Sequence, residues 1–113
     1  MIHYSFFEQQ CIDIFGEKFT VELLQNGVDF TNANYGGFGL KPTRVAFPNG
    51  STDPWHALGI TSKDNISPGN IAVFINGTAH CADMYPSGDA DLKSLVEARQ
   101  QIIDFLQTSL QAD

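Results

Sequence analysis

Apolar positions near the start of the chain recur with the spacing of an α-helix. Within residues 5–15, four of them fall on one face: Phe7, Cys11, Ile14 and Phe15. The run Ser5-Phe6-Phe7-Glu8 has the capping-box pattern that begins a helix, and Gly16 is suited to ending one. The pattern therefore predicts a first helix over residues 5–15.

A second helical pattern runs from about residue 20 to about residue 32. Val21, Leu24 and Val28 form its apolar stripe, and Thr20 is placed to cap its first turn. Asn26-Gly27 weakens the middle and leaves open a break there. The following residues 34–39 are rich in glycine, so we predict a loop.

Two short apolar runs in the centre of the chain read as strands. The first spans residues 43–47 and should end at Pro48; the second, residues 71–75, is apolar throughout, which predicts burial on both faces. About twenty residues join them, long enough for a parallel crossover but far longer than a hairpin loop. We expect Pro54 to Leu58 to form a helical turn and residues 62–70 a surface loop.

The last third of the chain predicts a long helix beginning near Asp89. Asp89 and Asp91 would suit its positive end. One face with a 3.6-residue period would collect eight side chains: Leu92, Leu95, Val96, Arg99, Ile102, Ile103, Leu106 and Leu110. The predicted fold class is α/β, with two parallel strands, flanking helices and a long C-terminal helix. Two strands alone leave both sheet edges open, as if cut from a larger sheet.

Composition narrows the classes of partner. Six basic and 13 acidic residues give a formal net charge of −7. The chain lacks the basic stripe that nucleic acid or an anionic membrane surface requires, and no apolar run is long enough to span a bilayer. The first eight residues lack the basic and apolar regions of a signal peptide. We expect no cofactor.

Cys11 and Cys81 are the two cysteines, too few to indicate a redox compartment. They could pair with each other, pair with cysteines elsewhere, or stay free. Among three glycosylation sequons, those at Asn49 and Asn76 lie in Asn-Gly pairs typical of turns after strands. Asn65, in a polar loop, is the candidate glycan site.

Two residues that could carry out chemistry follow the ends of the two predicted strands. Asp53 follows the first and His80 the second, 27 residues apart. In open α/β sheets function gathers at the carboxyl ends of strands, and a histidine base needs a carboxylate to fix its tautomer. Each residue also has a simpler interpretation: Asp53 as a helix N-cap before Pro54, and His80 as a loop histidine bonded to the backbone. Their joint placement favours an acid–base pair.

Other candidates are weaker. His56 falls inside the predicted helical turn, which favours a surface or packing role. Ser51 lies only two residues before Asp53, too close to act as the nucleophile, and the sequence contains no Gly-X-Ser-X-Gly. The run His80-Cys81-Ala82-Asp83 places its ligands poorly for a single tetrahedral ion, so we expect no metal.

The chain resembles the family of prolyl carboxypeptidase, dipeptidyl peptidase II and thymus-specific serine protease. The specific segments are Asn-Gly-Ser-Thr-Asp-Pro-Trp-His at 49–56 and Gly-Thr-Ala-His-Cys-Ala-Asp-Met at 77–84. The resemblance implies an α/β-hydrolase with a helical cap, in which Asp53 and His80 are the triad acid and base and Trp55 lies near the substrate pocket. It implies a peptide substrate, often cleaved at proline, and a secreted or lysosomal setting.

The resemblance covers only the C-terminal part of that family. Residues 1–40 would belong to the cap or linker region, and residues 41–113 would hold the last two strands and the final helix. We therefore expect the C-terminal portion of a serine exopeptidase, either carboxypeptidase or dipeptidyl peptidase, inactive alone because the nucleophile is absent from these residues. The alternative is a non-catalytic short product that acts as a binding module, and a homodimer is left open.

Overall fold

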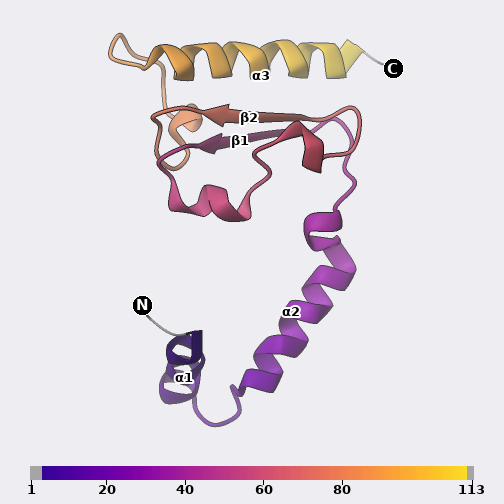
Figure 1. Ribbon diagram of the computed structural model, residues 1–113, viewed down its shortest axis with the longest axis vertical. Helices are drawn as coiled ribbons and strands as arrows, with labels where there is room; N and C mark the ends of the chain where they lie inside the picture. Colours follow the sequence, from indigo (N-terminus) through magenta and orange to yellow (C-terminus); the bar gives the residue numbers. More distant parts are fainter. Residues whose placement is uncertain (1–3, 112–113) are drawn as a thin grey trace. The chain divides into compact units, whose positions relative to one another are not determined.

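The computed structural model describes residues 4–111, which divide into two compact units. Unit 1 is Met1–Leu40 and unit 2 is Lys41–Asp113. Unit 1 contains two α-helices, whereas unit 2 contains a parallel sheet and a long helix (Figure 1). The parallel strands together with the helices agree with the α/β class predicted from the sequence.

Both predicted helices of unit 1 are confirmed, as α1 (Tyr4–Phe15) and α2 (Val21–Tyr35). Thr20 caps α2 as predicted, because its hydroxyl oxygen accepts a hydrogen bond from the Leu23 amide at 3.2 Å. The helix is not broken at Asn26-Gly27. It ends three residues beyond the predicted end, where Gly36 takes a left-handed φ of 87° and donates to the Asn32 carbonyl at 2.8 Å.

Two details of the prediction for unit 1 are wrong. Ser5 lies inside α1, so it is not the residue that precedes the helix. The expected loop over residues 34–39 begins in the last turn of α2 and continues as a short 3₁₀ helix, Gly37–Gly39. Glycine at these positions ends one helix through positive φ but still permits a tight turn after it.

Unit 2 is built on two parallel strands, β1 (Ala46–Gly50) and β2 (Ile71–Ile75). Their register pairs Ala46 with Ile71 and Gly50 with Ile75. The parallel arrangement and the bounds of β2 are as predicted, but β1 begins and ends three residues later and contains Pro48 rather than ending before it. Within the described residues β1 pairs only with β2, and a strand with one open edge tolerates a proline that cannot donate.

The hydrophobic core of unit 2 lies between the sheet and α3 (Lys93–Gln111). It is formed by Val73 and Ile75 of β2 with Leu95 and Ala98 of α3, all at most 6% exposed. Figure 1 shows α3 running along one side of the two strands. Phe74 points to the other side and is 48% exposed, so the prediction that β2 is buried on both faces is wrong for this chain.

The start of the last helix was also predicted wrongly. It begins at Lys93 rather than near Asp89. Asp91 does not occupy the first turn, because its carboxylate accepts from the Gly88 amide at 3.0 Å and pairs with the Arg99 guanidinium at 2.5 Å. Both contacts hold residues 88–92 as a loop. None of the helices within residues 4–111 has the length and apolar character to cross a bilayer.

Candidate functional site

The turns that follow β1 and β2 are hydrogen-bonded to each other. The Thr52 amide and hydroxyl both donate to the Thr78 carbonyl, at 3.0 and 2.6 Å. The Gly77 amide donates to the Ser51 hydroxyl at 2.8 Å. These bonds fix the position of the residues that come next in each turn, Asp53 and His80.

Gly50 allows the two turns to approach this closely. A Cβ atom at this position would lie 2.5 Å from the carbonyl oxygens of both Thr78 and Ala79. Such contacts are shorter than real Cβ atoms make, so any larger residue would push the two turns apart. The glycine of the Asn49-Gly50 pair thus serves close approach at the end of β1 rather than the turn predicted for this pair.

Asp53 and His80 are in direct contact. The His80 Nδ1 atom lies 2.7 Å from Asp53 Oδ2, and the other carboxylate oxygen, Oδ1, accepts from the Trp55 amide at 3.0 Å. Asp53 is 7% exposed, whereas the side chain of His80 is 68% exposed. Asp53 therefore makes two contacts at once: one oxygen caps the helical turn Pro54–Leu58, as predicted, and the other binds the histidine.

The surroundings of Asp53 favour its charged form. The hydrogen bond from His80 lowers the pKa of Asp53 below its ordinary value, and burial opposes that shift. The Trp55 amide, together with the charge that His80 and His56 carry when protonated, lowers it further. With Asp53 ionised at neutral pH, His80 Nδ1 donates to it, which in the neutral ring leaves Nε2 as the proton acceptor.

The remaining predicted residues lie around this pair or away from it. The His56 ring packs edge-on against Phe74, with centroids 5.4 Å apart, and its Nδ1 lies 2.6 Å from the main-chain oxygen of Asp53. Trp55 is 66% exposed at the start of the same helical turn. The Ser51 hydroxyl is engaged in the turn contacts described above. Asn65 is exposed at the end of a short 3₁₀ helix.

Cys11 and Cys81 are both free thiols in the structure. Within residues 4–111, histidine, cysteine, aspartate and glutamate side chains do not gather in groups of three that could hold a metal ion.

Arg99 is the residue near the site that the sequence prediction missed. It was assigned to the apolar stripe of the last helix, yet its guanidinium binds the loop that follows His80. The signal was present, because an arginine within an otherwise apolar helical face needs charged or carbonyl partners when it is buried.

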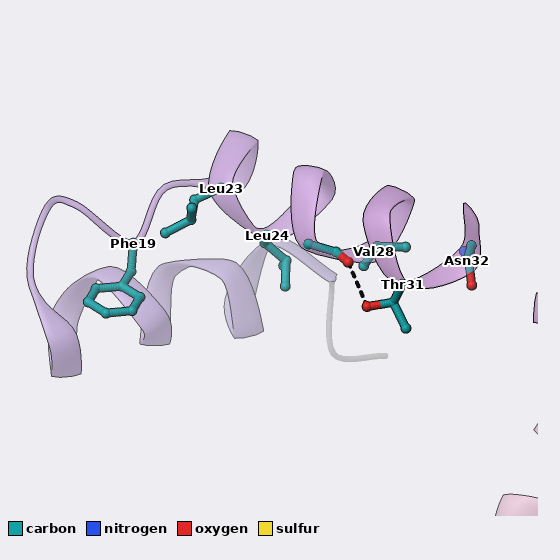
Figure 2. Close-up of a pocket in the computed structure, with 7 residues that line it drawn as sticks. Phe19, Leu23, Leu24, Val28, Thr31 and Asn32 are labelled. Carbon is teal, nitrogen blue, oxygen red and sulfur yellow. Dashed lines mark hydrogen bonds between the residues drawn. The ribbon is translucent and has the colours of Figure 1, made fainter. Parts of the chain in front are cut away.

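Unit 1 contains an apolar hollow of about 630 Å³ beside α2. Seven residues line it: Phe19, Leu23, Leu24, Gly27, Val28, Thr31 and Asn32. Figure 2 shows most of these side chains along one side of α2, with Thr31 donating to the Gly27 carbonyl at 2.8 Å. None of the lining residues is an acid or a base, so this hollow offers no side chain for proton transfer.

Comparisons with known proteins agree with the resemblance seen in the sequence. The family model described as serine carboxypeptidase S28 matches residues 2–102. A Caenorhabditis elegans protein named as a candidate serine protease, K12H4.7, is 44% identical over 112 residues, which are 96% of this chain and 21% of that protein. The thymus-specific serine proteases of Mus musculus and Homo sapiens are 38% and 36% identical, over 86% and 88% of this chain and 18% and 19% of theirs.

The chain thus spans about a fifth of the length of the curated relatives it matches. No solved structure gives a significant match.

Proposed function

Because the chain belongs to the serine carboxypeptidase S28 family, we propose that Asp53 and His80 are the acid and base of a Ser-Asp-His triad. The nucleophilic serine would come from a segment outside these 113 residues. One observation carries the proposal: a buried carboxylate holds Nδ1 of a histidine whose side chain is otherwise exposed. The exposed ring leaves Nε2 open to a serine hydroxyl.

The roles of the two residues follow from general acid–base chemistry. In the proposed mechanism, His80 Nε2 takes the proton of the serine hydroxyl as that oxygen attacks the peptide carbonyl, and later returns the proton to the leaving amine. Asp53 fixes the ring through Nδ1 and stabilises the imidazolium that forms between these steps. Its lowered pKa supports this role, because the carboxylate stays charged throughout.

A chimera tests the proposal. In mouse thymus-specific serine protease, the segment aligned with this chain would be replaced by the residues of this chain. A fluorophosphonate reagent, which labels only an activated serine, should modify the chimera and fail to modify its His80→Ala variant. Equal labelling of both folded proteins would show that His80 does not activate the serine.

The family resemblance also suggests which peptides the whole enzyme would cleave. We propose an exopeptidase directed at proline-containing peptides, with Trp55 lining the substrate pocket. Its side chain is 66% exposed and lies two residues after Asp53 in the sequence, which supports that role. In the chimera, Trp55→Ala should raise KM for a proline-containing peptide by about tenfold, since an aromatic contact of this kind is worth on the order of 1.5 kcal/mol. An unchanged KM would remove Trp55 from the pocket.

A secreted or lysosomal setting is proposed on the same resemblance. Asn65 supports it, because the sequon asparagine is exposed and so accessible to glycosylation. Expressed behind a secretory leader, the chain should carry a glycan that Asn65→Gln removes, as a mass measurement would show. An unchanged mass on that substitution would place no glycan at Asn65.

A further inference from the structure

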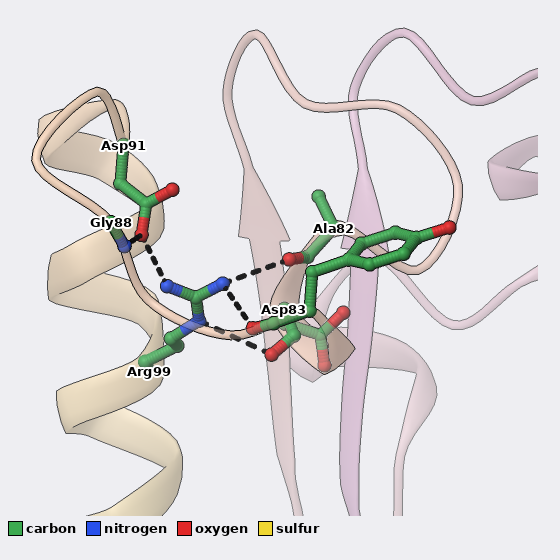
Figure 3. Close-up of polar contacts among 6 residues, drawn as sticks. Ala82, Asp83, Gly88, Asp91 and Arg99 are labelled. Carbon is green, nitrogen blue, oxygen red and sulfur yellow. Dashed lines mark hydrogen bonds and ion pairs between the residues drawn. The ribbon is translucent and has the colours of Figure 1, made fainter.

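Arg99 of α3 hydrogen-bonds to the loop that begins just after His80. Its Nη2 donates to the carbonyl oxygens of Ala82 at 3.0 Å and Tyr85 at 2.8 Å, and its Nε donates to the Asp83 carbonyl at 3.2 Å. Its Nη1 pairs with Asp91 Oδ2 at 2.5 Å. Figure 3 shows the guanidinium reaching from the helix into the middle of these acceptors.

These hydrogen bonds stabilise a loop that has little stability of its own. Residues 82–84 form a single 3₁₀ turn, and Cys81 before it takes a left-handed φ of 55°. A three-residue turn beginning from that conformation has little intrinsic stability. One planar guanidinium satisfies three of its main-chain carbonyls, a geometry that the single ammonium of lysine does not reproduce.

The Arg99 side chain is only 17% exposed, and its ion pair with Asp91 offsets the free-energy cost of burying the guanidinium charge. The Gly88 amide and the Arg99 guanidinium both lower the pKa of Asp91, so the partner stays ionised. The two ends of the loop, residues 82–85 and residue 91, are thereby tied to the same side chain.

We propose that Arg99 is a positioning residue that holds His80 against Asp53 through the loop of residues 82–91. On its N-terminal side, His80 is fixed by buried Thr78, whose carbonyl accepts from Thr52. On its C-terminal side, the Arg99 hydrogen bonds fix the chain. The side chain of His80 is itself 68% exposed, so these flanking contacts set its place. The consequence for catalysis rests on the proposed triad.

Arg99 acts through the loop and not through its charge. The pKa of Asp53 is lowered mainly by the His80 hydrogen bond and raised by burial, and the Trp55 amide and the charges of His80 and His56 lower it further. The contacts of Arg99 are with the loop and with Asp91. This distinction makes the inference testable in the 113-residue chain, because the His80 hydrogen bond is the largest cause of the lowered Asp53 pKa.

The test is a carbon-13 NMR titration of the Asp53 carboxyl in Arg99→Gln and in Asp91→Asn. The first variant removes a positive charge and all four Arg99 contacts. The second removes a negative charge and the ion pair that anchors the Arg99 guanidinium in the loop. If position is what matters, both should bring the pKa of Asp53 back toward its ordinary value of 3.8. A through-space effect of charge would instead raise it in one variant and lower it in the other.

Lys93→Gln is the matched control. It also removes one positive charge from α3, but Lys93 pairs with Glu97 on the same helix and not with the loop of residues 82–91. It should leave the pKa of Asp53 at the parent value. The inference is overturned if Arg99→Gln and Asp91→Asn also keep the parent value, or if they shift it in opposite directions.

If Arg99→Gln does not fold, Arg99→Lys provides a second test of the same inference. It keeps the charge and most of the stem but loses the planar fork, and it should still raise the pKa of Asp53. In the chimera described above, Arg99→Lys should lower kcat by about 100-fold with little change in KM, as expected for a misplaced base. Failure of the proposed function would leave the parent chimera inactive and the NMR titration unaffected, so the two failures are distinguishable.

Discussion

The two units of this chain obtain their structure in different ways. In unit 1, local signals suffice: Thr20 caps α2, Gly36 ends it, and Gln25 bonds Asp29 one turn later. Yet α2 buries none of its residues within the described chain, and Phe30 is 69% exposed. In unit 2 the decisive contacts join residues more than twenty positions apart, and four apolar side chains form a core.

The contrast separates secondary structure from tertiary structure. Helix caps and periodicity specify unit 1, in which none of the residues with described side chains is fully buried. By contrast, the turns after β1 and β2 form a site only because they pack on one another. Substitutions in unit 2 should therefore cost far more than substitutions of the same kind in unit 1.

The largest expected effect on stability comes from the core. Ile75→Ala removes the most buried side chain, which is 2% exposed, and should lower the free energy of unfolding of unit 2 by about 3 kcal/mol. Phe30→Ala, in unit 1, removes a larger side chain but should change stability by only about 0.5 kcal/mol. Urea unfolding of both variants measures the difference, and equal losses would erase the contrast between the units.

Alanine substitutions at two glycines, one in each unit, should change stability by smaller amounts and in opposite directions. Gly50→Ala places a methyl group 2.5 Å from two carbonyl oxygens and should destabilise unit 2 by about 2 kcal/mol. Gly27→Ala meets nothing within 4 Å in the middle of α2 and should stabilise that helix by about 1 kcal/mol. Thermal unfolding followed by circular dichroism would show both; stabilisation by Gly50→Ala would contradict the close approach of the two turns.

The smallest expected effect is a pH dependence of the stability of unit 2. Because the pKa of Asp53 is lower in the folded chain than its ordinary value of 3.8, the unfolded chain binds more protons between the two values. The ionised Asp53 therefore adds to the free energy of unfolding of unit 2. This added stability is fully present above pH 3.8 and is lost as the pH falls through the pKa of Asp53 in the folded chain. Urea midpoints between pH 6 and pH 2.5 should fall less in Asp53→Asn than in the parent, with Asp29→Asn in unit 1 as the control for loss of one carboxylate.

Much of this arrangement could be predicted from the sequence, because its signals are local. Apolar periodicity located α1, α2 and β2, and the position of Asp53 and His80 after two strands predicted their contact. What failed was decided by tertiary structure, which local sequence patterns do not encode. Pro48 is tolerated because one edge of β1 is open, and the start of α3 is displaced because Asp91 binds Arg99.

Arg99 shows the limit most plainly. Helical periodicity placed it on one face with the apolar side chains of the last helix, and that placement says nothing about which loop its guanidinium would bind. Its acceptors are main-chain carbonyls of residues 82–85, and carbonyl groups are present at every position of a sequence. Only the folded loop identifies them.

The central claim is that His80, and not its neighbour His56, transfers the proton. The most direct measurement is kcat of the chimera and its variants on a proline-containing peptide. His80→Ala should abolish nearly all turnover, and Asp53→Asn should cost about 10⁴-fold, the loss known for the equivalent change in a trypsin-like triad. His56→Ala should cost less than about tenfold, because its ring packs on Phe74. A dead His56→Ala with an active His80→Ala would contradict the account, and full activity in all three variants would favour a binding module instead.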